Sequence, residues 1–146
     1  MLIKDLMTRS PVCCKPSDTL DTVAKLMLEN DCGEIPVCDG ANLVGVITDR
    51  DITCRAVATG RTPMDVAVAE VMTHNPYIVH QDQKLDAALE VMEERRVRRL
   101  PVVDDQHRIV GIVSQADLVA RAPILKVARL VKSVSKQTRG FAAEAR

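Results

Sequence analysis

The chain contains one pattern of residues twice, and this repeat limits its fold more than any other feature. Asp5-Leu6-Met7-Thr8 returns 65 positions later as Glu70-Val71-Met72-Thr73. The same spacing relates further matches: Pro11/Pro76, Leu20/Leu85, Asp21/Asp86, Met27/Met92, Glu29/Glu94, Pro36/Pro101, Val37/Val102 and Asp39/Asp104. The period exceeds the roughly 20–50 residues of solenoid repeats. We therefore expect two copies of a compact unit, related by a pseudo-twofold axis, with clefts between them that suit small molecules.

Length and composition agree with two mutually dependent copies. A unit of roughly 60 residues buries too little surface to be comfortably stable alone, so in a chain of 146 residues the copies are expected to need each other. Apolar residues make up 47% of the chain, but its aromatic residues are only Tyr77 and Phe141. The core is therefore predicted to be aliphatic, and base stacking on single-stranded nucleic acid is disfavoured.

The start of the chain, its apolar runs and its cysteines indicate the cellular location of the protein. The start of the chain does not resemble a signal peptide, and no apolar run approaches the ~18 residues of a membrane span, so we expect a cytoplasmic protein. All five cysteines fall in the first copy: Cys13, Cys14, Cys32, Cys38 and Cys54. No C-x-x-C occurs, and Cys13 and Cys14 are too close for an unstrained bridge. We predict reduced cysteines that act as small apolar residues, with a redox or metal role as the alternative.

Charge is distributed unevenly along the chain. Residues 1–120 carry 13 Lys and Arg against 19 Asp and Glu, whereas residues 121–146 carry 7 against 1. Apolar residues recur at helical spacing in 124–136, which predicts a basic amphipathic helix. Docking of this tail on nucleic acid or an anionic membrane is one alternative. We expect instead no nucleic-acid or membrane binding, and a solvated helix that adds to a dimer interface.

Each copy has the pattern of a β-α-β-β-α unit, so the predicted fold class is α/β with an added C-terminal helix. The predicted strands after the first helices are 35–38 and 43–48, then 100–103 and 109–114. Second helices are expected from Asp49 and Gln115, and Asp18 and Asp82 are predicted to cap the first helices. The predicted organisation is copy one at 1–60, a linker at 61–65, copy two at 66–122, and the basic helix and tail at 123–146.

Two matching segments carry a resemblance to a known family. Residues 45–51 (GVITDRD) and 111–117 (GIVSQAD) resemble the G-h-h-[ST]-x-x-D signature of CBS domains. With the preceding helix, the I/L-P-V strand and the Met-Thr-x-x-Pro opening, the resemblance covers roughly residues 1–122. Two copies in register resemble a stand-alone tandem CBS protein, a Bateman module.

The signature also has a physical interpretation. It places Thr48 and Ser114 at helix N-termini, where free backbone N–H groups favour phosphate. Asp51 and Asp117 lie one turn further on, where each can accept the hydroxyls of a ribose. Together these groups suit an adenosine nucleotide. The alternative is a capping box, in which the same Ser/Thr-x-x-Asp pattern serves only the helix, and both roles can coexist.

The resemblance implies further binding residues. It implies an apolar adenine slot in each copy, formed by Val12, Cys13, Ile35, Pro36 and Val37, and by Tyr77, Ile78, Leu100, Pro101 and Val102. Core packing is the alternative for each of them. Arg98 and Arg99 resemble the basic segment that reaches nucleotide phosphates in the γ subunit of AMP-activated kinase, and their planar guanidinium groups match phosphate oxygens. The first copy has Gly33 and Glu34 there, so the two clefts should bind unequally.

Other polar residues carry weaker signals. Arg95 and Arg96 are expected to cap the preceding helix or to remain solvated. His74, His80 and His107 lack metal-ligand spacing, so we predict no metal site and assign them to the surface. His80 and the aligned Lys15 are further candidates for contact with phosphate.

The sequence therefore predicts a regulatory module that binds an adenosine-containing ligand. AMP, ADP or ATP fit the arginines best, NAD and S-adenosylmethionine remain alternatives, and no required cofactor is expected. The expected partners are a second copy of the chain and an unidentified regulated protein. Catalysis is disfavoured because no nucleophile–base pair, paired catalytic carboxylates or P-loop occurs. The alternative function is a ligand-free dimerisation or protein-docking module with vestigial clefts.

Overall fold

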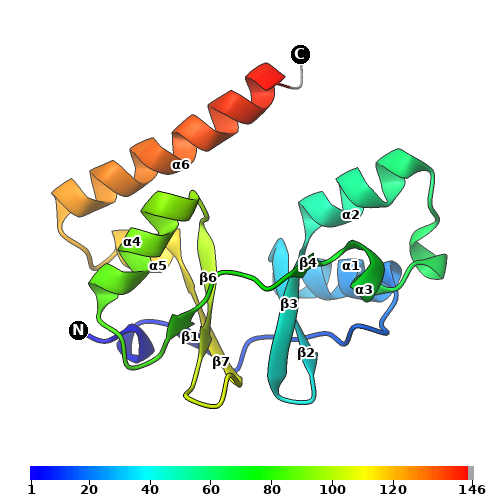
Figure 1. Cartoon of the computed structure of the whole chain (residues 1–146), viewed down its shortest axis with the longest axis horizontal. Coiled ribbons are helices and arrows are strands. Elements are labelled where there is room, and N and C mark those ends of the chain that lie inside the picture. Colours follow the sequence, from blue (N-terminus) through cyan, green and yellow to red (C-terminus); the bar gives the residue numbers. More distant parts are fainter. Residues whose placement is uncertain (145–146) are drawn as a thin grey trace. The chain divides into compact units, whose positions relative to one another are not determined.

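The computed structural model describes the backbone of residues 1–144 and the side chains of residues 1–135 (Figure 1). It divides into two compact units, each with its own core. Unit 1 contains Met1–Arg9, Tyr77–Asp105 and the chain from Val110 onward, and unit 2 contains Ser10–Pro76 and Gln106–Ile109. Both are mixed α/β, as the sequence predicts.

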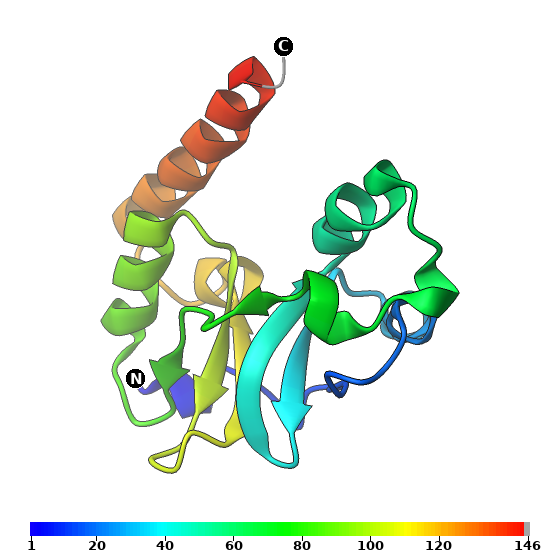
Figure 2. The same ribbon diagram turned by 45° about the vertical axis from the view of Figure 1, so that its right-hand side comes forward.

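Unit 2 is built on a hairpin covered by helices. Its elements are α1 (Leu20–Asn30), β2 (Glu34–Asp39), β3 (Asn42–Thr48), α2 (Asp49–Arg55), α3 (Val68–Val71) and β4 (Thr73–His74), with single 3₁₀ turns η2 (Val57–Thr59) and η3 (Pro63–Asp65) in the connection. The sheet order is β2-β3-β4, and Cys14 adds one parallel bridge to Val37. Helices α1 and α2 lie on the same side of the hairpin in Figures 1 and 2. Leu20, Val23 and Met27 are the buried residues of α1.

Unit 1 repeats this arrangement. It contains η1 (Ile3–Asp5), β1 (Thr8–Arg9), β5 (Val79–His80), α4 (Leu85–Arg95), β6 (Arg99–Val103), β7 (Ile109–Ser114), α5 (Gln115–Val119) and α6 (Ile124–Glu144), and its sheet order is β1-β7-β6-β5. Val79 pairs with Val102 in parallel, as Cys14 pairs with Val37 in unit 2. Buried Ala88, Leu89 and Met92 hold α4 on the core, which is entirely aliphatic among the described residues.

The opening segments of the two copies are exchanged between the units. Strand β1, from the start of copy one, pairs with β7 through Thr8↔Ile112 and Arg9↔Gly111. Strand β4, from the start of copy two, pairs with β3 through Val46↔Thr73 and Gly45↔His74. The register is the same in both cases. The compact units are therefore not simply the sequence copies, and the copy and linker boundaries at 60, 65 and 122 stay predictions about the repeat.

The glycine of each signature segment makes room for an opening segment. A Cβ atom on Gly45 would lie 2.7 Å from the carbonyl oxygen of Thr73. A Cβ atom on Gly111 would lie 2.9 Å from the carbonyl oxygen of Thr8 and 2.5 Å from the Met7 sulfur. Since real Cβ atoms do not approach this closely, both positions require glycine for backbone contact rather than for conformational freedom.

The predicted strands and helix starts agree with the structure, but the predicted N-caps of α1 and α4 do not. Strand β7 and the starts of α2 and α5 fall at the predicted residues. The N-caps of α1 and α4 are Thr19 and Lys84, so the assignment of Asp18 and Asp82 as caps is wrong. Asp18 instead accepts a 2.8 Å hydrogen bond from the Lys15 amide, and Asp82 pairs with Lys4 at 2.8 Å.

Helix α6 packs along α4 (Figures 1 and 2). The spacing in 124–136 predicts an apolar face that includes Ile124 and Val134. Val134 is buried as predicted, whereas Ile124 is 86% exposed and the fully buried Leu130 lies outside the predicted face. Lys126 pairs with Asp86 on α4, and another ion pair joins Arg129 and Glu93 at 3.2 Å. The helix continues past the predicted 124–136, while positions 145–146 of the predicted tail lie outside the described residues. No helix in the described part of the chain is long and apolar enough to cross a membrane.

Candidate functional site

The four predicted site residues of the signature segments lie at two equivalent corners, where a strand leads directly into a helix. At the β3–α2 corner, the Asp51 amide donates to Thr48 Oγ1 and the Thr48 amide donates to Asp51 Oδ2, both at 3.0 Å. At the β7–α5 corner, the corresponding distances between Asp117 and Ser114 are 3.2 and 2.7 Å. Both corners are therefore capping boxes, and the capping alternative is confirmed. A binding role for the same four residues stays a prediction.

The two aspartates differ in accessibility. Asp51 is 7% exposed, and its Oδ1 lies 3.7 Å from Arg55 Nε. Arg55 also donates to the carbonyl oxygens of Val71 and Met72 at 3.0 and 3.3 Å, so it ties α2 to the end of α3. Asp117 is half-buried. Sequence reasoning missed Arg55, although its position four residues after Asp51 is the spacing of a helical ion pair.

A loop from the same copy meets each corner. The Gln115 amide, at the start of α5, donates to the Arg98 carbonyl oxygen at 2.8 Å. The equivalent bond in unit 2 runs from the Asp49 amide to the Gly33 carbonyl oxygen at 2.9 Å. This contact brings Arg98 to the Ser114 corner. Arg99, the next residue, is exposed at the start of β6.

The corresponding position in unit 2 has the opposite charge. A Cβ atom on Gly33 would lie 2.8 Å from Asp49 Oδ2, so the Asp49 carboxylate lies directly over the glycine. Glu34 follows at the start of β2. The unit 2 corner is therefore rich in carboxylates, which repel phosphate, whereas two arginines adjoin the unit 1 corner. Sequence reasoning identified Glu34 but missed Asp49.

The residues of the implied adenine slots divide into two groups by burial. Ile35, Val37, Leu100 and Val102 are each 0% exposed and belong to the two cores. Pro36 and Pro101 are buried in the same strands. Core packing therefore accounts for these six residues, and any contact with a ligand stays a prediction.

The remaining slot residues reach the surface. Val12 is 36% exposed and Tyr77 50% exposed, while Cys13 and Ile78 are half-buried. The Arg95 guanidinium lies over the Tyr77 ring, 5.0 Å from its centroid, a cation–π contact that the sequence analysis did not predict. Arg96 is the C-cap of α4, in agreement with its predicted role.

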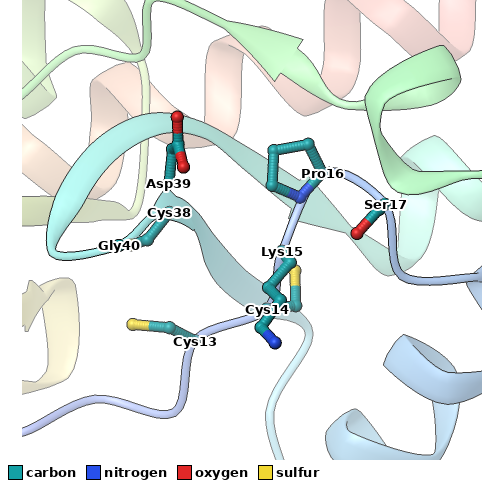
Figure 3. Close-up of a pocket in the computed structure, with 8 residues that line it drawn as sticks. All are labelled: Cys13, Cys14, Lys15, Pro16, Ser17, Cys38, Asp39 and Gly40. Carbon is teal, nitrogen blue, oxygen red and sulfur yellow. The ribbon is translucent and has the colours of Figure 1, made fainter.

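A pocket of about 570 Å³ lies at the other end of the β2–β3 hairpin from Thr48 (Figure 3). Its lining is Cys13, Cys14, Lys15, Pro16, Ser17, Cys38, Asp39 and Gly40. Cys13 is the one predicted slot residue in this lining, so the pocket is separate from the Thr48–Asp51 corner. Contact of Lys15 or His80 with phosphate stays a prediction.

Metal ligands are not gathered in the part of the chain that the structure describes. Within it, no group of three or more His, Cys, Asp and Glu side chains could hold a metal ion. His74, His80 and His107 are all exposed, as predicted.

Comparison with known proteins identifies the family. The model of the CBS domain matches residues 3–56 and 68–124, and the chain belongs to this family as a tandem CBS protein. It is 36% identical over 132 residues to hypoxic response protein 1 of Mycobacterium tuberculosis, covering 90% of this chain and 92% of that protein. It is 38% identical over 120 residues to the CBS domain-containing protein YhcV of Bacillus subtilis, covering 80% and 81%.

Solved structures of similar proteins share the fold. Hypoxic response protein I, crystallised with two coordinated zinc ions, has a TM-score of 0.77 at 36% identity and covers 84% of this chain and 100% of that one. CBSX2 in complex with AMP has a TM-score of 0.71 at 28% identity, covering 82% and 93%. The CBS domain pair of protein MJ0100, in complex with 5′-methylthioadenosine and S-adenosyl-L-methionine, has a TM-score of 0.74 at 30% identity, covering 82% and 94%.

Proposed function

We propose that this chain is a regulatory module that binds a phosphorylated adenosine ligand, AMP, ADP or ATP, at the β7–α5 corner of unit 1. Similar CBS pairs bind AMP, or S-adenosylmethionine and 5′-methylthioadenosine, which supports an adenosine-containing ligand. CBS domains are generally regulatory rather than catalytic, and we propose no reaction for this chain.

The observation that carries the proposal is the hydrogen bond from the Gln115 amide to the Arg98 carbonyl oxygen, 2.8 Å long. Because of this bond, a pair of arginines adjoins the Ser114–Asp117 corner. Guanidinium groups bind phosphate through parallel donors, which adds charge and geometric selectivity. Half-buried Asp117 would accept the ribose hydroxyls, and exposed Tyr77 would contact the adenine.

The β3–α2 corner of unit 2 is proposed as the weaker site. Asp51 is almost fully buried and engaged by Arg55, and Asp49 occupies the space beside Gly33. A phosphate placed there would meet the Asp49 carboxylate, and the nearby Arg55 guanidinium is already engaged by Asp51 and two backbone carbonyl oxygens. NAD and S-adenosylmethionine remain alternative ligands, and the arginines favour the one with more phosphate charge.

A second candidate is a ligand-free dimerisation or docking module. The observation in its favour is the exposed apolar surface of α6, where Ile124 and Leu125 are 86% and 81% exposed. Both candidates include a homodimer, a separate regulated protein and a cytoplasmic location, and they differ in whether a nucleotide binds.

A thermal-shift and calorimetry panel tests the proposal. The ligands are AMP, ADP, ATP, NAD, S-adenosylmethionine and adenosine, each with the full chain. A ligand at 100 times its Kd stabilises the folded state by about 2.7 kcal/mol, which corresponds to several degrees in Tm. We expect a shift with a phosphorylated ligand and a smaller one with adenosine. No shift and no heat with any ligand would favour the docking module.

Matched variants locate the site. Asp117→Ala and Arg98→Gln should abolish or strongly weaken binding, whereas Asp51→Ala should weaken it less. Since both aspartates cap a helix, calorimetry is carried out well below each variant's Tm, so that lost affinity is separated from lost stability. Equal losses for the two aspartates, or unchanged binding by Arg98→Gln, would contradict the assignment to unit 1. Unaltered nucleotide after prolonged incubation, measured chromatographically, is expected because no catalysis is proposed.

A further inference from the structure

Three of the five cysteines gather at one pocket in unit 2. Cys13, Cys14 and Cys38 line it together with Lys15 and Asp39 (Figure 3). All five cysteines are free thiols. The predicted role of these residues, small apolar side chains, accounts for their burial but not for their gathering at one pocket.

The backbone pairing places the three thiols on two opposite faces of the paired segments. Cys14 is bridged in parallel to Val37: its amide donates to the Pro36 carbonyl oxygen at 3.0 Å, and its own carbonyl oxygen accepts from the Cys38 amide at 2.8 Å. Cys14 and Val37 belong to the core of unit 2. Because neighbouring side chains in extended backbone point to opposite faces, Cys13 and Cys38 lie on the other face of this pair.

Cys13 and Cys38 flank the paired Cys14 and Val37 and line the same pocket. The Cys13 thiol donates a hydrogen bond of 3.4 Å to the Pro11 carbonyl oxygen. Cys13 is half-buried, so small oxidants can reach it, whereas Cys38 is 4% exposed. Cys13 itself lies outside the sheet strands, and the ladder is irregular between Val37 and Cys38, so both backbone positions can adjust.

The three thiols differ in acidity in a way that assigns roles to them. The neighbouring Cys38 thiol lowers the pKa of Cys13, which increases the fraction of reactive thiolate. The same neighbourhood raises the pKa of Cys38. Burial raises the pKa of Cys14 to about 12, so Cys14 stays a protonated, inert thiol.

We propose that Cys13 and Cys38 form an oxidisable pair that closes to an intramolecular disulfide when the protein meets a hydroperoxide. The Cys13 thiolate attacks the peroxide, the O–O bond breaks, and Cys13 becomes a sulfenic acid while the peroxide leaves as water or an alcohol. The Cys38 sulfur then attacks the Cys13 sulfur, the S–OH bond breaks, and the hydroxyl group leaves as water with the Cys38 proton. The two thiols lose two electrons and two protons in total, and the hydroperoxide is the two-electron oxidant.

The second copy provides an internal comparison. Its residues at the matching positions are Ile78 and Val103, so the fold accepts ordinary aliphatic side chains at both places. Cysteine is therefore not required there for packing. The double variant Cys13→Ile/Cys38→Val transfers the second-copy residues and removes only the chemistry.

The test oxidises the reduced full chain with hydrogen peroxide, alkylates the remaining thiols under denaturing conditions and measures intact and peptide masses. The expected product has the mass of a single chain less two hydrogen atoms, and three of its five thiols remain open to alkylation. Its linked peptides contain Cys13 and Cys38. In Cys38→Ser, a sulfenic acid on Cys13 should be trapped by dimedone, and the double variant should give neither product. Cys54→Ser, which removes an exposed thiol, should behave like the wild type.

Three results would overturn the proposal: a linkage that involves Cys54 or joins two chains, oxidation of Cys13 to sulfinic acid without a linkage, or no loss of thiols at peroxide concentrations that oxidise a free thiol. Circular dichroism checks that each variant is folded. The residues of the stronger proposed nucleotide site belong to unit 1 and the thiol pair to unit 2, and the readout here is mass alone. The two proposals can therefore fail separately.

Discussion

Substitution of Gly45 by alanine tests whether the exchanged opening segment is held by close backbone contact. Gly45 lies in β3 opposite His74, and an added Cβ would meet the Thr73 carbonyl oxygen at 2.7 Å and the Met72 sulfur at 3.0 Å. The φ angle of Gly45 lies outside the left-handed region, so alanine can adopt the same backbone conformation. At an uncrowded position of this kind, glycine-to-alanine would stabilise by about 0.4–1 kcal/mol. Only the contact with β4 can reverse that sign.

The magnitude depends on which of two responses is cheaper. If β4 stays paired, strands β3 and β4 must separate slightly, and overpacking of this kind costs about 1–3 kcal/mol. If β4 detaches, the protein loses ladder hydrogen bonds worth about 0.5–1.5 kcal/mol each. It also loses the burial of Met72, which is 6% exposed and contributes about 1.5–3 kcal/mol. The first response is cheaper, so we expect a net loss of about 1–2 kcal/mol and a fall in Tm of about 2–4 °C per kcal/mol.

Urea unfolding measures the loss, and hydrogen exchange shows where it acts. Exchange should accelerate in the segment from Met72 to His74 in Gly45→Ala. Gly40→Ala is the control, because its Cβ would meet nothing within 4 Å and its cost comes only from a φ of +62°. It should leave exchange in β4 unchanged. A Gly45→Ala protein as stable as the wild type or more so would refute the close contact.

Three further predictions concern packing, capping and pH. Leu130→Ala should destabilise by about 2–5 kcal/mol because Leu130 is the fully buried residue by which α6 joins the unit 1 core. Exposed Ile124→Ala should change the free energy of unfolding by no more than about 0.5 kcal/mol in urea, and equal effects would contradict this packing. Thr48→Ala and Ser114→Ala should each cost about 0.5–2 kcal/mol, recovered by aspartate at the same position, and unchanged unfolding midpoints would refute the caps. Burial raises the pKa of Cys14 from 9.0 to about 12, so its contribution to the free energy of unfolding is complete below pH 9 and falls as the pH rises toward 12. Cys14→Val should lose less stability over this range, and a pH profile identical to that of the wild type would contradict the assignment.

The parts of the fold that the sequence predicts are those governed by local chemistry. The Ser/Thr-x-x-Asp pattern predicts where α2 and α5 begin, because the hydroxyl and the carboxylate satisfy amides within one helical turn. The apolar run 109–114 is confirmed as β7. The caps of α1 were misassigned because Asp18 binds the Lys15 amide and forms a turn of its own.

Long-range features could not be predicted in the same way. Strands β1 and β4 are two residues long, and their partners lie in the other copy, so no local pattern marks them. The apolar residues of α6 lie on several sides of the helix, so their spacing alone did not distinguish buried Leu130 from exposed Ile124. The difference between the corners depends partly on Asp49, whose position over Gly33 is visible only in three dimensions. The capping contacts at both corners are confirmed, and their use by a ligand stays a prediction.

The exchange of opening segments fixes the order in which a growing chain can complete its units. Most of unit 2 is synthesised by Pro76, and its sheet can close while the remainder is still on the ribosome. Strand β1 is made first, yet its partner residue Ile112 is made more than a hundred positions later. Met7 must therefore wait unburied until β7 emerges, and closure of such a long loop slows folding. We expect β1 to become protected only after β7 has formed, and until then to be open to a chaperone or a protease.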